Sequence, residues 1–213
     1  MRTWIKICGT TSLEDALSSI AAGADALGFI FAESKRRVSV EQAQAIISQL
    51  PREVEKIGVF MNNSAAEICS VINAVELTGL QMHGEESPAA VYECLPPDRR
   101  DSMRKIKTIQ VKTGHQLRLD HVGGSNIVDT WLLDSGAGSG QTFDWETARK
   151  QWGERQWQFI VAGGLTPGNV GEAMRVFRPW GVDVVTGVER GPGRKDPGKL
   201  RAFVAAVRKA EQI

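Results

Sequence analysis

Residues 3–31 read TWIKICGTTSLEDALSSIAAGADALGFIF, and this segment shows what kind of fold the chain forms. Its two ends, Thr3–Cys8 and Ala26–Phe31, are short apolar runs typical of buried strands. Between them, Ser12 precedes a segment with acidic residues in its first turn, and Gly23 follows that segment as a capping glycine does. The segment therefore predicts a strand, a helix and a second strand, which is one β-α-β unit.

The same alternation of apolar runs and helical segments continues along the chain. The expected strands are Thr3–Cys8, Ala26–Phe31, Lys56–Phe60, Leu77–Met82, Lys105–Val111, Ile127–Asp134, Gln158–Ala162 and Gly181–Val185. The expected helices lie near residues 12–22, 40–49, 64–75, 87–95, 114–121, 144–151, 168–177 and 196–210. Such alternation builds a parallel sheet that is either closed or open. Eight units favour a closed (βα)8 TIM barrel, and we expect residues 1–213 to form it as a single domain.

Capping residues mark the start of several of these helices. Ser64 precedes Ala-Ala-Glu, which is a capping-box pattern. Thr166 followed by Pro167 predicts an N-cap with proline at the first helical position. Gly114, Gly123 and Gly124 crowd the fifth expected helix, and glycine disfavours helix formation.

Charge and composition exclude several classes of partner. The 213 residues include 26 basic and 25 acidic side chains, for a net charge of +1. A protein that grips nucleic acid or an anionic membrane needs a basic excess, so we expect neither partner. No group of residues has metal-ligand spacing, and no metal or cofactor is expected. The expected partner is a small phosphorylated molecule, and the protein is expected to act as a monomer or homodimer.

Cysteine usage and hydropathy indicate a cytoplasmic protein. The three cysteines, Cys8, Cys69 and Cys94, form no CxxC pair, so a disulfide framework is not expected. The N-terminus lacks the long apolar core of a signal peptide. No apolar run approaches the length that a membrane span requires.

Glycine-rich segments after the last three expected strands predict a phosphate site. They are Gly136-Ala-Gly138-Ser-Gly140, Gly163-Gly164 and Gly187. Glycine lets backbone N–H groups approach an anion closely, and barrels often hold phosphate in the loops after strands seven and eight. The alternative is that these glycines only make tight turns. Two such loops on neighbouring strands favour phosphate binding.

Cys8 and Asp134 are the candidate proton-transfer residues, because each ends a strand at the face where barrels carry their chemistry. Side chains alternate along a strand, so Lys6 and Cys8 are expected to point into the barrel. A free cysteine is often a small buried apolar residue, but a thiol becomes a usable base where nearby positive charge lowers its pKa. Asp134 could merely cap the next loop; otherwise it is a candidate general acid.

Arg36 and His83 are candidate binding residues in the loops after the second and fourth strands. Arginine suits two-point recognition of a carboxylate, so Arg36 or its neighbour Arg37 could hold an acidic group of the substrate. His83 is a weaker candidate, because a lone histidine is usually a hydrogen-bonded structural residue.

These motifs, in this order, resemble the phosphoribosylanthranilate isomerase family. The motifs are Lys6-Ile-Cys8-Gly9-Thr-Thr, Gly28-Phe-Ile-Phe31, Ser34-Lys-Arg36-Arg-Val-Ser39, Gly58-Val-Phe60, Gln81-Met-His83-Gly84, Leu133-Asp134-Ser, Gly140-Gln-Thr-Phe143-Asp144-Trp145, Ala162-Gly-Gly-Leu-Thr-Pro167 and Gly187-Val-Glu189. The resemblance runs from residue 5 to about 205, and its first block together with the Thr-Phe-Asp-Trp block is highly specific.

The resemblance implies an Amadori rearrangement without a cofactor, in tryptophan biosynthesis. N-(5-phosphoribosyl)anthranilate would become 1-(2-carboxyphenylamino)-1-deoxyribulose 5-phosphate. Cys8 matches the family's general base, Asp134 its general acid and Arg36 the arginine that holds the anthranilate carboxylate. The residues that match the phosphate cradle are Gly163, Gly164 and Gly187, beside Gly140 and Thr186 as further binding candidates.

Two departures from the family pattern touch the expected site. Val185-Thr186 stands where the family commonly has Ser-Ser, so only Thr186 can offer a hydroxyl to phosphate. The loop after the second strand contains Glu33 and is short against the common pattern, which leaves Arg36 and Arg37 both open for the carboxylate.

Two rival functions follow from the same features. One is the related sugar-phosphate isomerase of histidine biosynthesis, a family that places an aspartate where Cys8 stands. The other is a barrel that binds phosphorylated aromatic ligands without converting them. The pair of acid and base candidates, Asp134 and Cys8, speaks against the second.

Overall fold

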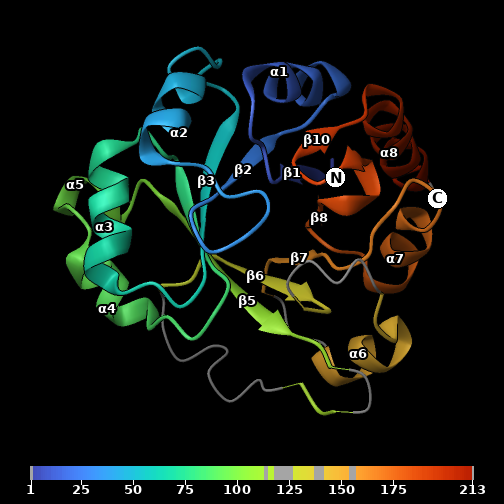
Figure 1. Ribbon diagram of the computed structural model, residues 1–213. Coiled ribbons are helices and arrows are strands. Elements are labelled where there is room, and N and C mark those ends of the chain that lie inside the picture. The colour runs from blue at the N-terminus through green and yellow to red at the C-terminus, as the bar shows by residue number, and fades with distance from the viewer. Residues whose placement is uncertain (1, 113–114, 118–126, 137–141, 154–156, 213) are drawn as a thin grey trace.

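The computed structural model describes residues 2–112, 115–117, 127–136, 142–153 and 157–212, and in it eight parallel strands close into a barrel (Figure 1). The barrel strands are β1 (Trp4–Cys8), β2 (Ala26–Ile30), β3 (Glu55–Phe60), β4 (Gly79–Met82), β5 (Arg104–Gln110), β6 (Thr130–Asp134), β7 (Phe159–Val161) and β8 (Gly181–Val184). Each strand pairs with the next, and β1 pairs with β8 in a register that places Lys6 opposite Asp183. The predicted (βα)8 barrel is confirmed.

Helices surround the barrel on the outside (Figure 1). They are α1 (Leu13–Ala22), α2 (Val40–Ile47), α3 (Ala65–Ala74), α4 (Pro88–Cys94), α5 (Pro97–Arg100), α6 (Trp145–Trp152), α7 (Val170–Phe177) and α8 (Pro197–Ala210). The predicted caps hold for α1 and α3. Ser12 accepts a hydrogen bond from the Asp15 N–H and Gly23 ends α1 at φ +105°, while Ser64 begins α3 with a full capping box. None of the helices in the described residues is long and apolar enough to cross a membrane.

Three details differ from the sequence-based expectation. Thr166 does not cap α7, because the helix begins at Val170 with Asn169 as its N-cap residue, and residues 167–169 form a turn between Thr166 and the helix. Of the fifth expected helix, residues 115–117 are not helical, and residues 114 and 118–121 lie outside the described residues. A short 3-10 helix, η1 (Thr186–Val188), and a two-stranded hairpin, β9 (Glu189–Gly191) with β10 (Arg194–Lys195), were not expected between β8 and α8.

The alternation of side chains along the strands divides the apolar core into two layers. Ile5 and Ile7 of β1 belong to the large cluster packed between strands and helices. Trp4, on the opposite face of the same strand, belongs to a smaller cluster inside the barrel. The inner cluster consists of Trp4, Ala26, Ile57, Ile106, Leu132, Ile160 and Ala162. Lys6 shares the face of Trp4, so the barrel interior becomes polar toward the ends of its strands.

Candidate active site

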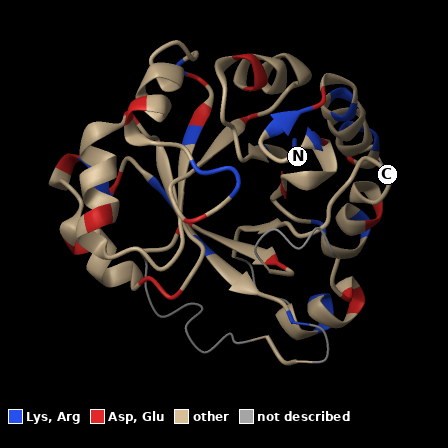
Figure 2. Ribbon diagram, viewed as in Figure 1, with Lys and Arg blue, Asp and Glu red and all other residues tan. Residues whose placement is uncertain are grey.

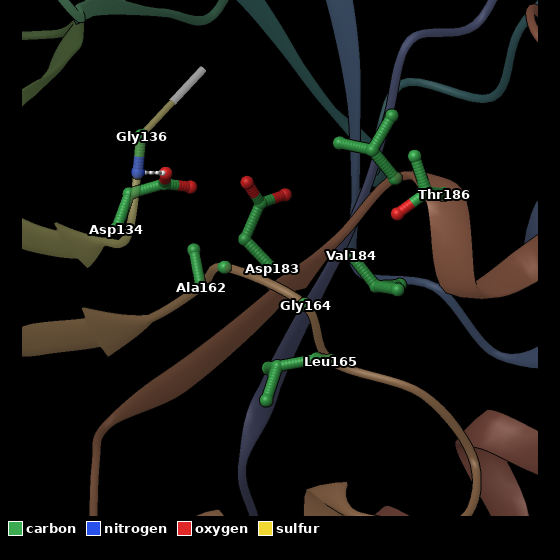
Figure 3. Close-up of a pocket in the computed structure, with 10 residues that line it drawn as sticks. Asp134, Gly136, Ala162, Gly164, Leu165, Asp183, Val184 and Thr186 are labelled. Atoms are coloured by element: carbon green, nitrogen blue, oxygen red, sulfur yellow. Dashed lines mark hydrogen bonds between the residues drawn. The ribbon is translucent and has the colours of Figure 1, made fainter. Parts of the chain in front are cut away.

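A pocket at the carboxyl ends of β6, β7 and β8 joins the candidate acid to the candidate phosphate loops (Figure 3). It is lined by Asp134, Gly136, Ala162, Gly163, Gly164, Leu165, Asp183, Val184, Val185 and Thr186. The carboxylates of Asp134 and Asp183 lie close together on one side of it, and Thr186 lies beyond Asp183 (Figure 3). Residues far apart in the sequence are therefore brought to one cavity.

Gly163 and Gly164 line this pocket and Gly187 follows its lining residue Thr186, and at all three positions a side chain is disfavoured. Gly163 and Gly164 have φ angles of +80° and +62°, which disfavour other residues. A Cβ atom on Gly163 would lie 2.6 Å from Oγ of Ser135, and one on Gly187 would lie 2.0 Å from the carbonyl oxygen of Leu165. Glycine at these positions therefore lets the loops pack closely against Ser135 and Leu165 at the edge of the pocket. Gly140, the remaining glycine candidate, lies outside the described residues.

Asp134 ends β6 and is held as a weak acid. Its Oδ1 atom accepts a hydrogen bond of 2.6 Å from the N–H of Gly136. Burial raises the pKa of Asp134 to about 6; the Gly136 N–H and Lys6 act against this rise, and the charge of Asp183 adds to it. At pH 7 about one molecule in ten then carries a proton on this carboxyl, against about one in a thousand for an ordinary aspartate. The predicted acid therefore has a proton to give near neutrality.

A buried ion pair between Lys6 and Asp183 forms the floor of the site. Lys6 Nζ lies 3.0 Å from Asp183 Oδ1 and 2.9 Å from Oε1 of Gln81. Burial lowers the pKa of Lys6, but the charges and hydrogen bonds of Asp183 and Cys8 outweigh it, so the net shift is upward. The sequence analysis missed Asp183, although an acidic residue between two valines of a buried strand was a usable signal.

His83 is held by the same network as a neutral hydrogen-bond donor. Oε1 of Gln81 accepts a hydrogen bond from Lys6, so the amide nitrogen of Gln81 faces His83. That nitrogen lies 3.1 Å from His83 Nδ1 and donates a hydrogen bond to this atom. Burial and the charge of Lys6 lower the pKa of His83 to about 4. The proton therefore sits on Nε2, a buried atom with no hydrogen-bond partner among the described residues. His83 therefore carries an unsatisfied donor inside the protein, although it is not among the residues that line the pocket.

Cys8 ends β1 as a buried thiol whose proton is tightly held. A Cβ atom on Gly28 of the neighbouring strand would lie 2.5 Å from the Cys8 sulfur, so this glycine makes room for it. Burial raises the pKa of Cys8 by more than Lys6 and Lys195 lower it, and the charge of Asp183 adds to the rise. The expectation of a pKa lowered by nearby charge is therefore wrong in its net direction, because burial outweighs the lysines.

Arg36 is half-buried and lies over the end of β1, whereas Arg37 is exposed. The Arg36 side chain passes over Gly9, where a Cβ atom would come within 2.7 Å of its Cδ. Its Nε and Nη2 atoms donate to the Glu189 carboxylate at 2.9 and 2.7 Å. Lys195 contacts the same carboxylate, so the basic loop before α2 and the basic strand β10 lie next to each other (Figure 2).

The predicted residues thus fall into two neighbouring groups. Asp134 and the phosphate loops share the pocket, while Cys8 and Arg36 lie on the β1 side with Glu189 and Lys195. Lys6 influences the pKa of both Asp134 and Cys8 and so lies between the groups. Within the described ranges, no three His, Cys, Asp or Glu side chains gather as a metal site would require. The sequence analysis assigned no role to Glu189 or Lys195. Glu189 pairs with Arg36 and Lys195 reaches the carbonyl oxygen of Cys8, and both contacts join segments that are distant in the sequence.

Comparison with known proteins gives one consistent result. A family model described as N-(5'-phosphoribosyl)anthranilate (PRA) isomerase matches residues 5–206. The N-(5'-phosphoribosyl)anthranilate isomerase of Pseudomonas fluorescens is 43% identical over 212 residues, which cover 97% of this chain and 96% of that protein.

Solved structures agree with the sequence comparison. The crystal structure of phosphoribosyl anthranilate isomerase from Thermus thermophilus matches with a TM-score of 0.85 at 34% identity, covering 98% of this chain and 99% of that one. Another phosphoribosyl anthranilate isomerase, crystallised in complex with reduced 1-(o-carboxyphenylamino)-1-deoxyribulose 5-phosphate, matches with a TM-score of 0.80 at 34% identity, covering 97% and 99%.

Proposed function

The chain belongs to the N-(5'-phosphoribosyl)anthranilate isomerase family, and on this basis we propose that it converts N-(5-phosphoribosyl)anthranilate to 1-(2-carboxyphenylamino)-1-deoxyribulose 5-phosphate with Asp134 and Cys8 as its proton-transfer residues. Membership of the family makes it an isomerase of tryptophan biosynthesis. The residue roles are our proposal, as are a cytoplasmic location, a small phosphorylated substrate and action as a monomer or homodimer.

The observation that carries the proposal is the shared pocket of Asp134 and the glycine loops. A weak acid with a pKa of about 6 lies in the same cavity as Gly163, Gly164 and Thr186. A phosphate bound by backbone N–H groups at these loops would place the attached sugar beside Asp134. Ring opening of that sugar needs a proton donor at this position.

In the first step, Asp134 donates its proton to the ring oxygen of the ribose. The bond between that oxygen and C1 breaks, and the anthranilate nitrogen shares its electron pair with C1, which forms an iminium ion. The carboxyl group becomes a carboxylate, and Lys6 lies near enough to lower its pKa and so to favour that charge.

In the second step, Cys8 removes the proton from C2 of the opened sugar. The positive iminium nitrogen makes this C2 proton acidic, and it also favours the thiolate form of a nearby thiol. The electron pair of the C–H bond moves to form an enolamine, which relaxes to the ketone. A thiol with a raised pKa is a strong base once ionised, which suits removal of a proton from carbon.

The remaining candidates bind the two charged ends of the substrate. The phosphate is held by the backbone at Gly163, Gly164 and Gly187 and by the hydroxyl of Thr186. Arg36 holds the anthranilate carboxylate, since it lies at the mouth of the barrel while Arg37 is exposed. His83 offers its Nε2 proton as a further hydrogen-bond donor. Gly140 keeps the binding role inferred from its sequence.

A continuous fluorescence assay tests the function directly. Freshly generated phosphoribosylanthranilate loses its anthranilate-type fluorescence as it is converted. We expect the purified protein to speed this loss far beyond the uncatalysed breakdown. Saturable binding without loss of fluorescence would contradict the proposal and favour a barrel that binds phosphorylated aromatics without converting them.

Replacing Arg36 by alanine should mainly weaken substrate binding. We expect KM to rise by about tenfold or more with a smaller change in kcat, because a charge-assisted hydrogen bond to a carboxylate contributes about 1.5–3 kcal/mol. Steady-state kinetics of Arg36→Ala and Arg37→Ala, measured side by side, check this assignment. A large rise in KM for Arg37→Ala alone would move the carboxylate contact to the neighbouring residue.

The pH profile of kcat/KM should be level over a wide range. The active form needs Asp134 protonated and Cys8 ionised, although Asp134 has the lower pKa. Below about pH 6, activity falls about tenfold per unit because less thiolate is present while Asp134 stays protonated. From there up to the raised pKa of Cys8, the loss of protonated Asp134 is offset by the gain of thiolate. Above that pKa, activity falls.

The variant Cys8→Ala provides the contrast. Its residual activity depends on Asp134 alone, so it should fall about tenfold per unit above about pH 6 instead of staying level. The affinity of a product analogue, measured over the same range, corrects for titration of the substrate phosphate. A wild-type profile that falls from pH 6 upward would contradict the role of Cys8 as base.

A further inference from the structure

We propose that Glu189 is a positioning residue that orients Arg36, so that the free edge of its guanidinium faces the carboxylate of the substrate. This inference rests on the proposed function and extends it to a residue of the β9–β10 hairpin.

The contact between the two side chains divides the donors of Arg36. A guanidinium carries five N–H donors, on Nε, Nη1 and Nη2. Glu189 accepts from Nε at 2.9 Å and from Nη2 at 2.7 Å. Three protons remain, two on Nη1 and one on Nη2. One proton of each nitrogen points along the adjacent edge, where a second carboxylate can bind at two points. The side chains of Arg36 and Glu189 are only 11% and 4% exposed, so the fork has little room to turn.

Glu189 is itself fixed from several directions. Lys195 Nζ lies 3.2 Å from its Oε1 atom, and the Gly193 N–H donates to the same oxygen at 3.2 Å. Lys199 donates to the backbone carbonyl of Glu189 at 2.8 Å. Lys195 also donates to the carbonyl oxygen of Cys8. Lys195 therefore connects the carboxylate that orients Arg36 to the end of β1, the strand that carries the proposed base.

The charges of this cluster leave one positive charge for the substrate. Arg36 and Lys195 contribute two positive charges and Glu189 one negative charge. Lys195 is fully buried behind the carboxylate, so the accessible positive charge is on Arg36. Without the carboxylate the two cations would repel each other, and Arg36 would lose the hydrogen bonds that fix the orientation of its guanidinium.

The variant Glu189→Gln separates orientation from charge. A glutamine offers one oxygen to the two cations and adds positive charge to the site, so simple attraction would lower KM for the anionic substrate. Loss of orientation predicts the opposite, a rise in KM of about fivefold to tenfold with a much smaller change in kcat. Inhibition constants give a second measurement. Glu189→Gln should weaken the binding of a product analogue that bears the 2-carboxyl group. It should leave the binding of the phenyl analogue, which lacks that group, nearly unchanged.

Matched variants control for folding and for charge. Glu55→Gln removes the same charge from a similar fork at the other end of the barrel, where Glu55 accepts from Nε and Nη2 of Arg104. It should leave KM unchanged. Glu189→Asp keeps the charge beside Lys195 and should raise KM by a smaller factor than glutamine does. In an Arg36→Ala background, Glu189→Gln should raise KM no further.

The outcomes distinguish this inference from the function on which it depends. Without turnover by the wild type, the proposed function itself fails. An active wild type whose KM rises for Arg36→Ala, but not for Glu189→Gln or Glu189→Asp, overturns the role of Glu189 alone. The role of Glu189 is also overturned if Glu189→Gln raises the inhibition constants of both analogues equally. A general structural defect would weaken both, whether or not the analogue bears a carboxylate.

Discussion

Replacing Asp134 by asparagine should lower kcat by at least ~10²-fold, because the amide has no proton to give to the ring oxygen. Asparagine has nearly the same shape, and its amide oxygen can still accept the hydrogen bond from Gly136 that holds Asp134 in place. The fold and the phosphate loops should therefore survive. The measurement is kcat in the fluorescence assay, together with the melting temperature and the affinity of a product analogue.

The control is the same chemical change at a carboxylate outside the site. Asp144 caps α6, is exposed and accepts from the N–H of Thr147. Asparagine caps helices about as well as aspartate, so Asp144→Asn should retain full turnover and stability. Turnover by Asp134→Asn at the wild-type rate, with normal melting in both variants, would show that another group supplies the proton.

The fold was predictable because local signals repeat at each unit of the barrel. Short apolar strands, capping residues such as Ser12 and Ser64, and the glycine after α1 each indicate a boundary from neighbouring residues alone. Thr166 shows the limit of such signals: its cap pattern is local, but a turn over residues 167–169 follows it and the helix begins only at Val170. The β9–β10 hairpin was missed although its pairing is local, because strands of three and two residues are too short to show an alternating pattern.

The chemistry of the site was less accessible from the sequence than its location. Cys8 and Asp134 could be placed at the ends of strands, but their pKa values depend on burial, which only the closed barrel creates. Asp183 and Glu189 were missed because each acts through a partner far away in the chain, Lys6 and Arg36. A charged side chain inside a barrel needs a partner of opposite charge. A lone charged residue on a predicted inner face therefore indicates that its partner has not yet been identified.

Replacing Cys8 by alanine should also lower kcat by at least ~10²-fold, since no group remains at this position to remove the C2 proton. The substitution removes one buried atom beside Gly28 and its hydrogen bond with Lys6, which keeps its contacts with Asp183 and Gln81. Cys8→Ser should be as slow as alanine, because a serine hydroxyl does not ionise near neutral pH. Kinetics of both variants, with melting temperatures, test the prediction.

Two further variants, Cys69→Ala and Cys8→Asp, distinguish a chemical role of Cys8 from a role in packing. Cys69 of α3 is also a buried free thiol, so Cys69→Ala should cost some stability and no turnover. Cys8→Asp places a carboxylate where the proton must be accepted, and burial would raise its pKa toward neutrality. If Cys8 is the base, aspartate should restore part of the activity that serine and alanine lack, although serine is the closer match in size. If Cys8 only fills space, serine should be the best of the three, because it disturbs the packing least.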